Sequence, residues 1–148
     1  MQRLVPGQVL TRRDIATLFG GNARAFLPRV TGGDVVAGCF DPDVNPRVPH
    51  EVLVHSAPNA ILAAKRLVKQ CRVSSPTVVE GVTRPLTIPV FIKRAPNVWE
   101  YIGQFRAIRY SADKREVTLR VYEIRPRIYE KHVREYGEMK GILFLEME

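Results

Sequence analysis

Alternating apolar and polar residues dominate the second half of the chain. In residues 98–110 the large apolar residues Trp99, Tyr101 and Phe105, with Ala107, fall at odd positions. Glu100, Gln104 and Arg106 fall at even positions between them. A period of two predicts a strand with one buried face. Residues 88–124 as a whole predict three consecutive strands, with the turn SADK at residues 111–114 before the third.

Helical signals occur in three other places. Thr11 and Asp14 have the spacing of a helix-capping pair, and the glycines at 20 and 21 end that helix. Residues 57–70 predict a second helix with one apolar side and basic residues towards its end. Residues 128–136, after Pro126, predict a third, basic helix that stops at Gly137.

Shorter apolar runs predict the remaining strands. Residues 34–40, 51–55 and 142–147 are β-rich, and residues 78–79 are a candidate short strand. Residues 41–50 read DPDVNPRVPH, and three prolines in ten residues exclude a regular helix or a central strand. The pattern predicts an α+β fold, a curved antiparallel sheet or partial barrel flanked by helices.

The net charge of the chain bears on which kinds of molecule it binds. The 148-residue chain carries 23 Lys and Arg against 15 Asp and Glu, a net charge of +8. This favours phosphate-bearing partners, although basic charge can also serve solubility alone. Cys39 and Cys71 lack disulfide or zinc spacing, and no signal peptide or membrane span is seen. An intracellular protein is expected, in a prokaryotic cytoplasm or a eukaryotic nucleus.

Familiar catalytic motifs are missing. The chain has no P-loop, GxSxG, HExxH or dinucleotide fingerprint, and the histidines at 50, 55 and 132 are scattered. His50 and His55 lie near acidic residues, but their spacing is not specific for a metal. Cys39 reads as a buried core cysteine rather than a nucleophile. We therefore expect no catalytic residue, metal or cofactor, and an enzyme remains an alternative rather than the favoured class.

The order of the motifs resembles the SRA (SET- and RING-associated) domain, a branch of the PUA-like superfold that includes forms fused to HNH-type nucleases in modification-dependent restriction endonucleases. The matching pieces are GQVLTRRDIATLFGG, VVAGCFDPD, NAILAA, PVFIKR, WEYIGQFRA and LRVYEIRP. These pieces span residues 7–126. We predict one domain over residues 1–148, in which residues 127–148 form a last helix and strand. No HNH-like Cys/His cluster follows Pro126.

The resemblance implies a DNA-binding module that flips a modified cytosine, such as 5-methylcytosine, out of the duplex into a pocket. Phe40 would stack on the base and Asp43 would accept from its exocyclic amine, because a carboxylate suits that donor. Asp41 and Asn45 complete this predicted pocket, and His55 stands where the family has a second stacking tyrosine. Taken without the resemblance, these acids and amides also suit a turn that caps its own backbone.

Basic residues are the second part of the expected interface. Candidates for phosphate contacts are Arg24, Arg29, Lys65, Lys93, Arg94 and Arg106. The alternative for each is a solvated strand or helix edge. The expected partner is double-stranded, base-modified DNA, with no membrane association. The other readings are an enzyme acting on a modified base or nucleoside, and an RNA- or protein-interaction module of the same superfold.

Overall fold

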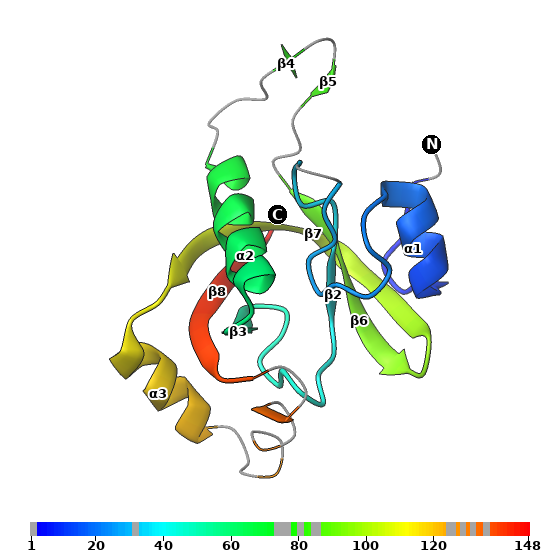
Figure 1. Ribbon diagram of the computed structural model, residues 1–148. Coiled ribbons are helices and arrows are strands. Elements are labelled where there is room, and N and C mark those ends of the chain that lie inside the picture. The colour runs from blue at the N-terminus through cyan, green and yellow to red at the C-terminus, as the bar shows by residue number, and fades with distance from the viewer. Residues whose placement is uncertain are drawn as a thin grey trace.

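A curved mixed sheet organises the chain (Figure 1). The computed structural model describes residues 3–30, 33–72, 78–79, 82–83, 87–123, 127, 130, 133–134 and 137–148. Within these residues, six strands pair in the order β2-β6-β7-β8-β3, with β1 on β7. The strands are β1 (Val9–Leu10), β2 (Gly38–Phe40), β3 (Glu51–His55), β6 (Ile88–Ala95), β7 (Val98–Ser111) and β8 (Met139–Met147).

The long strand β7 joins the two halves of the sheet. Its first half pairs with β6 on one side and with β1 on the other, and its second half pairs with β8. Pairs β6–β7, β7–β8 and β8–β3 are antiparallel, as the sequence predicted. Strand β2 runs parallel to β6, because a long connection with helix α2 (Pro58–Cys71) separates them in the chain.

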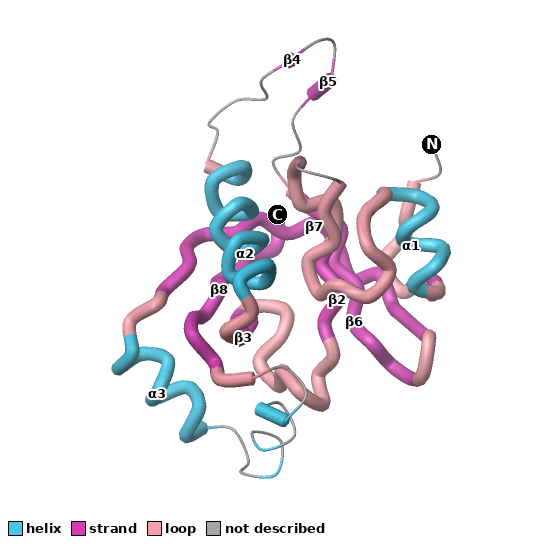
Figure 2. The backbone as a smooth tube through the Cα atoms, in the orientation of Figure 1, coloured by secondary structure: helices cyan, strands magenta, loops and turns pink. Residues whose placement is uncertain are grey.

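Helices pack against the sheet, as Figure 2 shows. Helix α1 (Arg12–Phe19) begins at the predicted capping box of Thr11 and Asp14 and ends at Gly20. Helix α2 matches the second predicted helix to within one residue at each end. Both predictions are confirmed, since local capping and one-sided apolar patterns decide where such helices lie.

Alternate strand residues pack on opposite faces. Val90 and Ile92 belong to the main core with α2, whereas Phe91 packs with Ile15 of α1. On β8, Leu143 faces the main core, and its neighbour Ile142 packs with the helix that follows β7. Helix α2 therefore covers one face, and α1 and the helix that follows β7 cover opposite ends of the second face.

The prediction of a third strand at residues 116–124 is wrong. Residues there form helix α3 (Lys114–Glu123). The Asp113 carboxylate accepts hydrogen bonds from the backbone N–H groups of Arg115 and Glu116, at 2.8 and 3.1 Å, which satisfies the open amides of a helix start. Val117 is buried and Leu119 is 58% exposed, so the alternating apolar residues do not share one buried face as they would in a strand.

Two further predictions need adjustment. The predicted strand at residues 34–40 is reduced to Gly38–Phe40, and Val35 forms only an isolated bridge with Arg29. Residues 78–79 do form a short strand, β4 (Val78–Val79), which pairs with β5 (Val82–Thr83). Most of the predicted 128–136 helix, with His132, lies outside the described residues.

The turn segment at residues 41–50 joins the two edges of the sheet. Strands β2 and β3 are at opposite ends of the strand order, and this segment runs directly from one to the other. Its turns are closed by backbone bonds, including Val44 N–H to Asp41 O at 3.2 Å and Val48 N–H to Asn45 O at 3.2 Å. The segment is ordered by its own hydrogen bonds, and it borders a pocket at the end of β2.

Candidate base-binding pocket

Both edge strands open onto one pocket, which we call pocket A. It has a volume of about 470 Å³ and is bounded by the end of β2, the 41–50 turn, β3, the start of α2, α1 and the 22–27 loop. Volumes of this order are typical of small-ligand sites. The lining includes Phe40, Asp41, Asn45 and His55 of the predicted base site, together with Arg24 and Lys93 of the predicted phosphate contacts.

Phe40 forms the floor of pocket A. It is 2% exposed and belongs to the main core. Its ring lies against the backbone of Gly38, where a Cβ atom would come within 2.8 Å of Cζ. The ring therefore supports the pocket from below and presents little free face to a ligand.

The two aspartates of the turn have different surroundings. Asp41 lines the pocket, and its Oδ1 accepts the backbone N–H of Asp43 at 2.9 Å. Its Oδ2 lies 3.8 Å from Nζ of Lys93. Asp43 is exposed and does not line pocket A. Of the two predicted aspartates, Asp41 therefore lines pocket A and Asp43 faces solvent at the Asx turn that Asp41 closes.

Asn45 is buried at the inner end of the turn. It is 7% exposed, and its Oδ1 accepts the backbone N–H of Leu53 at 3.2 Å. That bond ties the turn to β3. Among the described residues, Nδ2 of Asn45 has no hydrogen-bond partner, so one amide donor remains available where the residue lines the pocket.

His55 and Phe26 form an aromatic wall. Their ring centroids are 5.7 Å apart and the rings are tilted by 51°. The register of β3 against β8 shifts between Val54 and His55, an irregularity of the kind that redirects a side chain at the end of a strand. Burial lowers the pKa of His55 below its usual value, which favours the neutral ring at neutral pH. Phe26 was not among the predicted site residues.

Neither Arg12 nor Trp99 was among the predicted site residues. The Arg12 guanidinium lies 4.9 Å from the centroid of the Trp99 ring, and Nη2 donates to the carbonyl oxygens of Ala25 and Asn22 at 2.6 and 3.3 Å. Both residues line pocket A. From the sequence, Arg12 is predicted only to lie at the start of a helix, and Trp99 only to pack in the core. No local signal predicts that the two residues lie at one site.

Small residues at the start of α2 leave room in pocket A. Ala57, Ala60 and Ala63 face it. The helix begins without a side-chain cap and has no acidic residue in its first turn. The positive end of its dipole is therefore not neutralised locally, which adds to the positive potential of Arg24 and Lys93 at the pocket.

Cys39 lies at the pocket as a protonated thiol. It is 2% exposed, and burial raises its pKa to about 12. A thiol rather than a thiolate is present at neutral pH, so the prediction of a core cysteine fits its surroundings. Within the described residues, no group of three or more His, Cys, Asp or Glu side chains is arranged to hold a metal ion.

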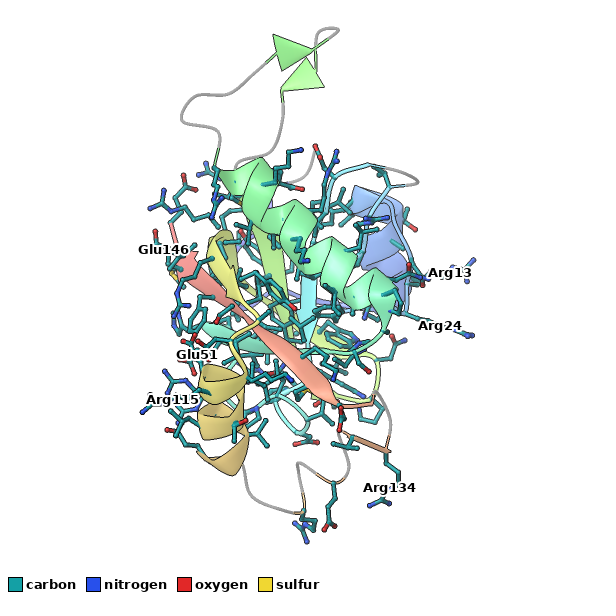
Figure 3. All side chains as sticks on the ribbon, turned by 60° about the vertical axis from the view of Figure 1, so that its left-hand side comes forward. Arg13, Arg24, Glu51, Arg115, Arg134 and Glu146 are labelled. Carbon is teal, nitrogen blue, oxygen red and sulfur yellow. The ribbon has the colours of Figure 1, made fainter. Side chains whose placement is uncertain are left out.

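The predicted basic contacts are dispersed over the surface. Arg94 pairs with Glu100 at 2.9 Å, and Arg106 Nε donates to Glu146 at 2.6 Å, so both are engaged with carboxylates away from pocket A. Arg29 lies at the bridge to Val35. Arg24 extends outward beside the N-terminal end of α2, on the same side as Arg13 (Figure 3). Only Arg24 and Lys93 of the six predicted residues line pocket A.

Comparisons with known proteins give one structural similarity. No protein-family model and no curated protein matches the chain. The solved structure of the "Sulfur binding domain and SRA domain of ScoMcrA complexed with phosphorothioated DNA" aligns with a TM-score of 0.46 and 12% identity. The match covers 97% of this chain and 39% of that chain, so this chain spans well under half of that protein. Similarity at this level assigns no ligand to this chain.

One further observation concerns membranes. In the part of the chain that the structure describes, none of the helices has the length and apolar character needed to cross a bilayer.

Proposed function

We propose that the chain is a DNA-binding module that accepts a base from the duplex, a modified cytosine, in pocket A. The observation that carries this proposal is the position of Asp41 beside Lys93 in the pocket, which Asn45 also lines. A carboxylate is the acceptor suited to the exocyclic amine of cytosine, and an amide donor suits its ring acceptors.

The walls of pocket A suit a flat ligand. The His55 and Phe26 rings offer one aromatic side, and the Phe40 ring closes the floor. Stacking on aromatic rings is worth about 1–3 kcal/mol per base, comparable with the few kcal/mol that extrusion of a base costs. The aromatic wall and the polar edge together therefore favour a flipped base over a ligand of another shape.

Cationic side chains around pocket A can bind the phosphates on either side of the flipped base. Arg12, Arg24 and Lys93 line the pocket together with the uncapped start of α2. Of these, Arg24 is exposed and extends outward (Figure 3). Contacts of this type position a nucleic acid without reading its sequence, so discrimination falls to Asp41 and Asn45.

The proposal is tested with a set of duplexes of one sequence that differ at a single cytosine. The set carries cytosine, 5-methylcytosine, 5-hydroxymethylcytosine or N4-methylcytosine, and a structured RNA serves as competitor. We expect at least one modified duplex to bind tenfold or more tightly than the plain duplex, and to resist the RNA. Equal affinities for all duplexes would rule out base reading, and preferential binding of the RNA would favour the RNA-binding alternative.

A further inference from the structure

A second basic pocket lies on the other flank of α2, and we call it pocket B. Its volume is about 800 Å³. It is formed between α2, the end of β7, α3 and the start of β8. Three lysines come to it from different elements: Lys65 from α2, Lys114 from α3 and Lys140 from β8. Charges gathered from three separate elements cannot be recognised as a cluster in the sequence.

The chemistry of pocket B favours anions. Lys65, Lys114 and Lys140 are exposed at the pocket, and Glu138 is the one carboxylate among its described lining residues. Lys140 Nζ lies 3.2 Å from Glu138 Oε2, with side chains that are 51% and 71% exposed. An ion pair this exposed contributes little and is readily exchanged for a phosphate. Flexible ammonium groups are common phosphate ligands.

Pockets A and B share α2 as their common wall. Ala57, Ala60 and Ala63 face pocket A, whereas Ile61 and Lys65 face pocket B. In Figure 1, α2 lies between α3 on one side and the α1–β2 region on the other. A helix with its side chains is about 10–12 Å wide. Successive phosphates of one DNA strand advance about 3.4 Å along the axis, so this width corresponds to about three nucleotides.

We propose that pocket B binds the backbone phosphates of the same DNA whose base enters pocket A, a few nucleotides from the flipped position. This inference rests on the proposed function. Helix α2 then lies against one DNA strand. The flipped base is in pocket A on one side of the helix, and the phosphates are in pocket B on the other. Pocket B supplies affinity without discrimination, because phosphate contacts carry no sequence information.

The test is the salt dependence of duplex binding for the full chain, with Lys65→Gln, Lys140→Gln and their double variant. Each lost phosphate contact lowers the slope of log K against log salt by about 0.9. The change in Kd between 50 and 200 mM salt then shrinks about threefold to fourfold per contact. The affinities for modified and plain duplexes should fall by the same factor, so that the preference between them stays constant.

Lys69→Gln is the matched control, because Lys69 is exposed one turn further along α2 and does not line pocket B. It removes the same charge and should leave the slope close to that of the wild type. Glu138→Gln should act in the opposite direction and tighten binding of every duplex, because it releases Lys140 from its carboxylate partner. Circular dichroism of each variant checks that the fold is retained.

The outcomes separate the two proposals. If the wild type discriminates modified from plain duplex but the pocket B variants and Lys69→Gln all give the wild-type slope, pocket B does not bind phosphate and the role of pocket A stands. An equal fall in slope for Lys69→Gln would show a general effect of charge and overturn the inference. If the wild type binds no duplex, the proposed function itself fails. A free deoxycytidine monophosphate that competes at pocket B as strongly as duplex would indicate a mononucleotide site instead.

Discussion

Asp41 directly follows strand β2, and its Oδ2 lies 3.8 Å from Nζ of Lys93 on the neighbouring strand β6. The parallel register pairs Phe40 of β2 with Ile92 of β6, so the residues that follow these two come side by side. The pair is loose and partly exposed, with side chains 23% and 37% accessible. Lys93 can therefore orient the carboxylate while leaving it able to accept a hydrogen bond from a ligand.

The two aspartates of the turn give a direct test of this arrangement. Asp41→Asn keeps Oδ1 as an acceptor for the Asp43 amide but replaces a charged acceptor in pocket A. We expect it to reduce the preference for the best modified duplex by about tenfold or more, since a specific base contact is worth about 1–3 kcal/mol. Competition binding of modified against plain duplex measures this ratio.

Asp43→Asn is the control for that experiment. It makes the same change of charge two residues away, at an exposed side chain outside pocket A. We expect its preference between duplexes to stay within about twofold of the wild type, as for other surface changes away from a site. The assignment to Asp41 would be contradicted if Asp43→Asn lost the preference and Asp41→Asn kept it.

Local signals explain how much of the fold was predictable. The capping box at Thr11 and the apolar pattern of residues 98–110 depend on nearby residues, and both predictions are confirmed. Residues 116–124 misled the prediction because Val117, Leu119 and Val121 alternate as in a strand. The competing signal was Asp113 followed three residues later by Glu116, which is the spacing of a helix start.

The site was predictable only in part, since it depends on tertiary contacts. Phe40, Asp41 and Asn45 are close in sequence, so the motif finds them together, but it does not show that Asp41 lines pocket A and Asp43 does not. Arg12 reaches the pocket because α1 packs beside Trp99, and Phe26 reaches it from a loop. Nothing in the residues adjacent to them signals this placement.

The buried thiol at pocket A gives a prediction that separates binding from catalysis. Because burial raises the pKa of Cys39 to about 12, the residue is a protonated thiol at pH 8. Iodoacetamide at pH 8 should leave Cys39 unmodified in the native protein and should label it after unfolding, as mass spectrometry of peptides would show. Cys39→Ala should bind DNA within about twofold of the wild type. Rapid native labelling, together with loss of an activity in Cys39→Ala, would favour the enzyme alternative.

The pair of Arg109 and Glu116 predicts an acid-dependent contribution to stability. Hydrogen bonds from Arg109, at 2.8 and 3.3 Å, and from Ser111, at 2.6 Å, hold the pKa of Glu116 at about 2, below its usual value of 4.5. Because the folded pKa is lowered, this contribution is present above about pH 4.5 and is lost as the pH falls towards 2.

Thermal unfolding of Glu116→Gln against the wild type measures that contribution. The wild type should have the higher Tm by a constant margin at pH 5 to 7, and the margin should shrink steadily between pH 4.5 and 2. A margin that stays constant down to pH 2, or that grows in acid, would contradict the assigned role of these hydrogen bonds.

The most direct test of base entry into pocket A is the affinity for a duplex whose target base has no pairing partner. Extrusion is least costly for an unpaired base, so a modified cytosine opposite an abasic site should bind about tenfold more tightly than the same cytosine paired with guanine. Ala60→Phe should abolish this gain, because Ala60 lines pocket A and a larger side chain would fill it. Equal or weaker binding of the unpaired duplex by the wild type would contradict the account.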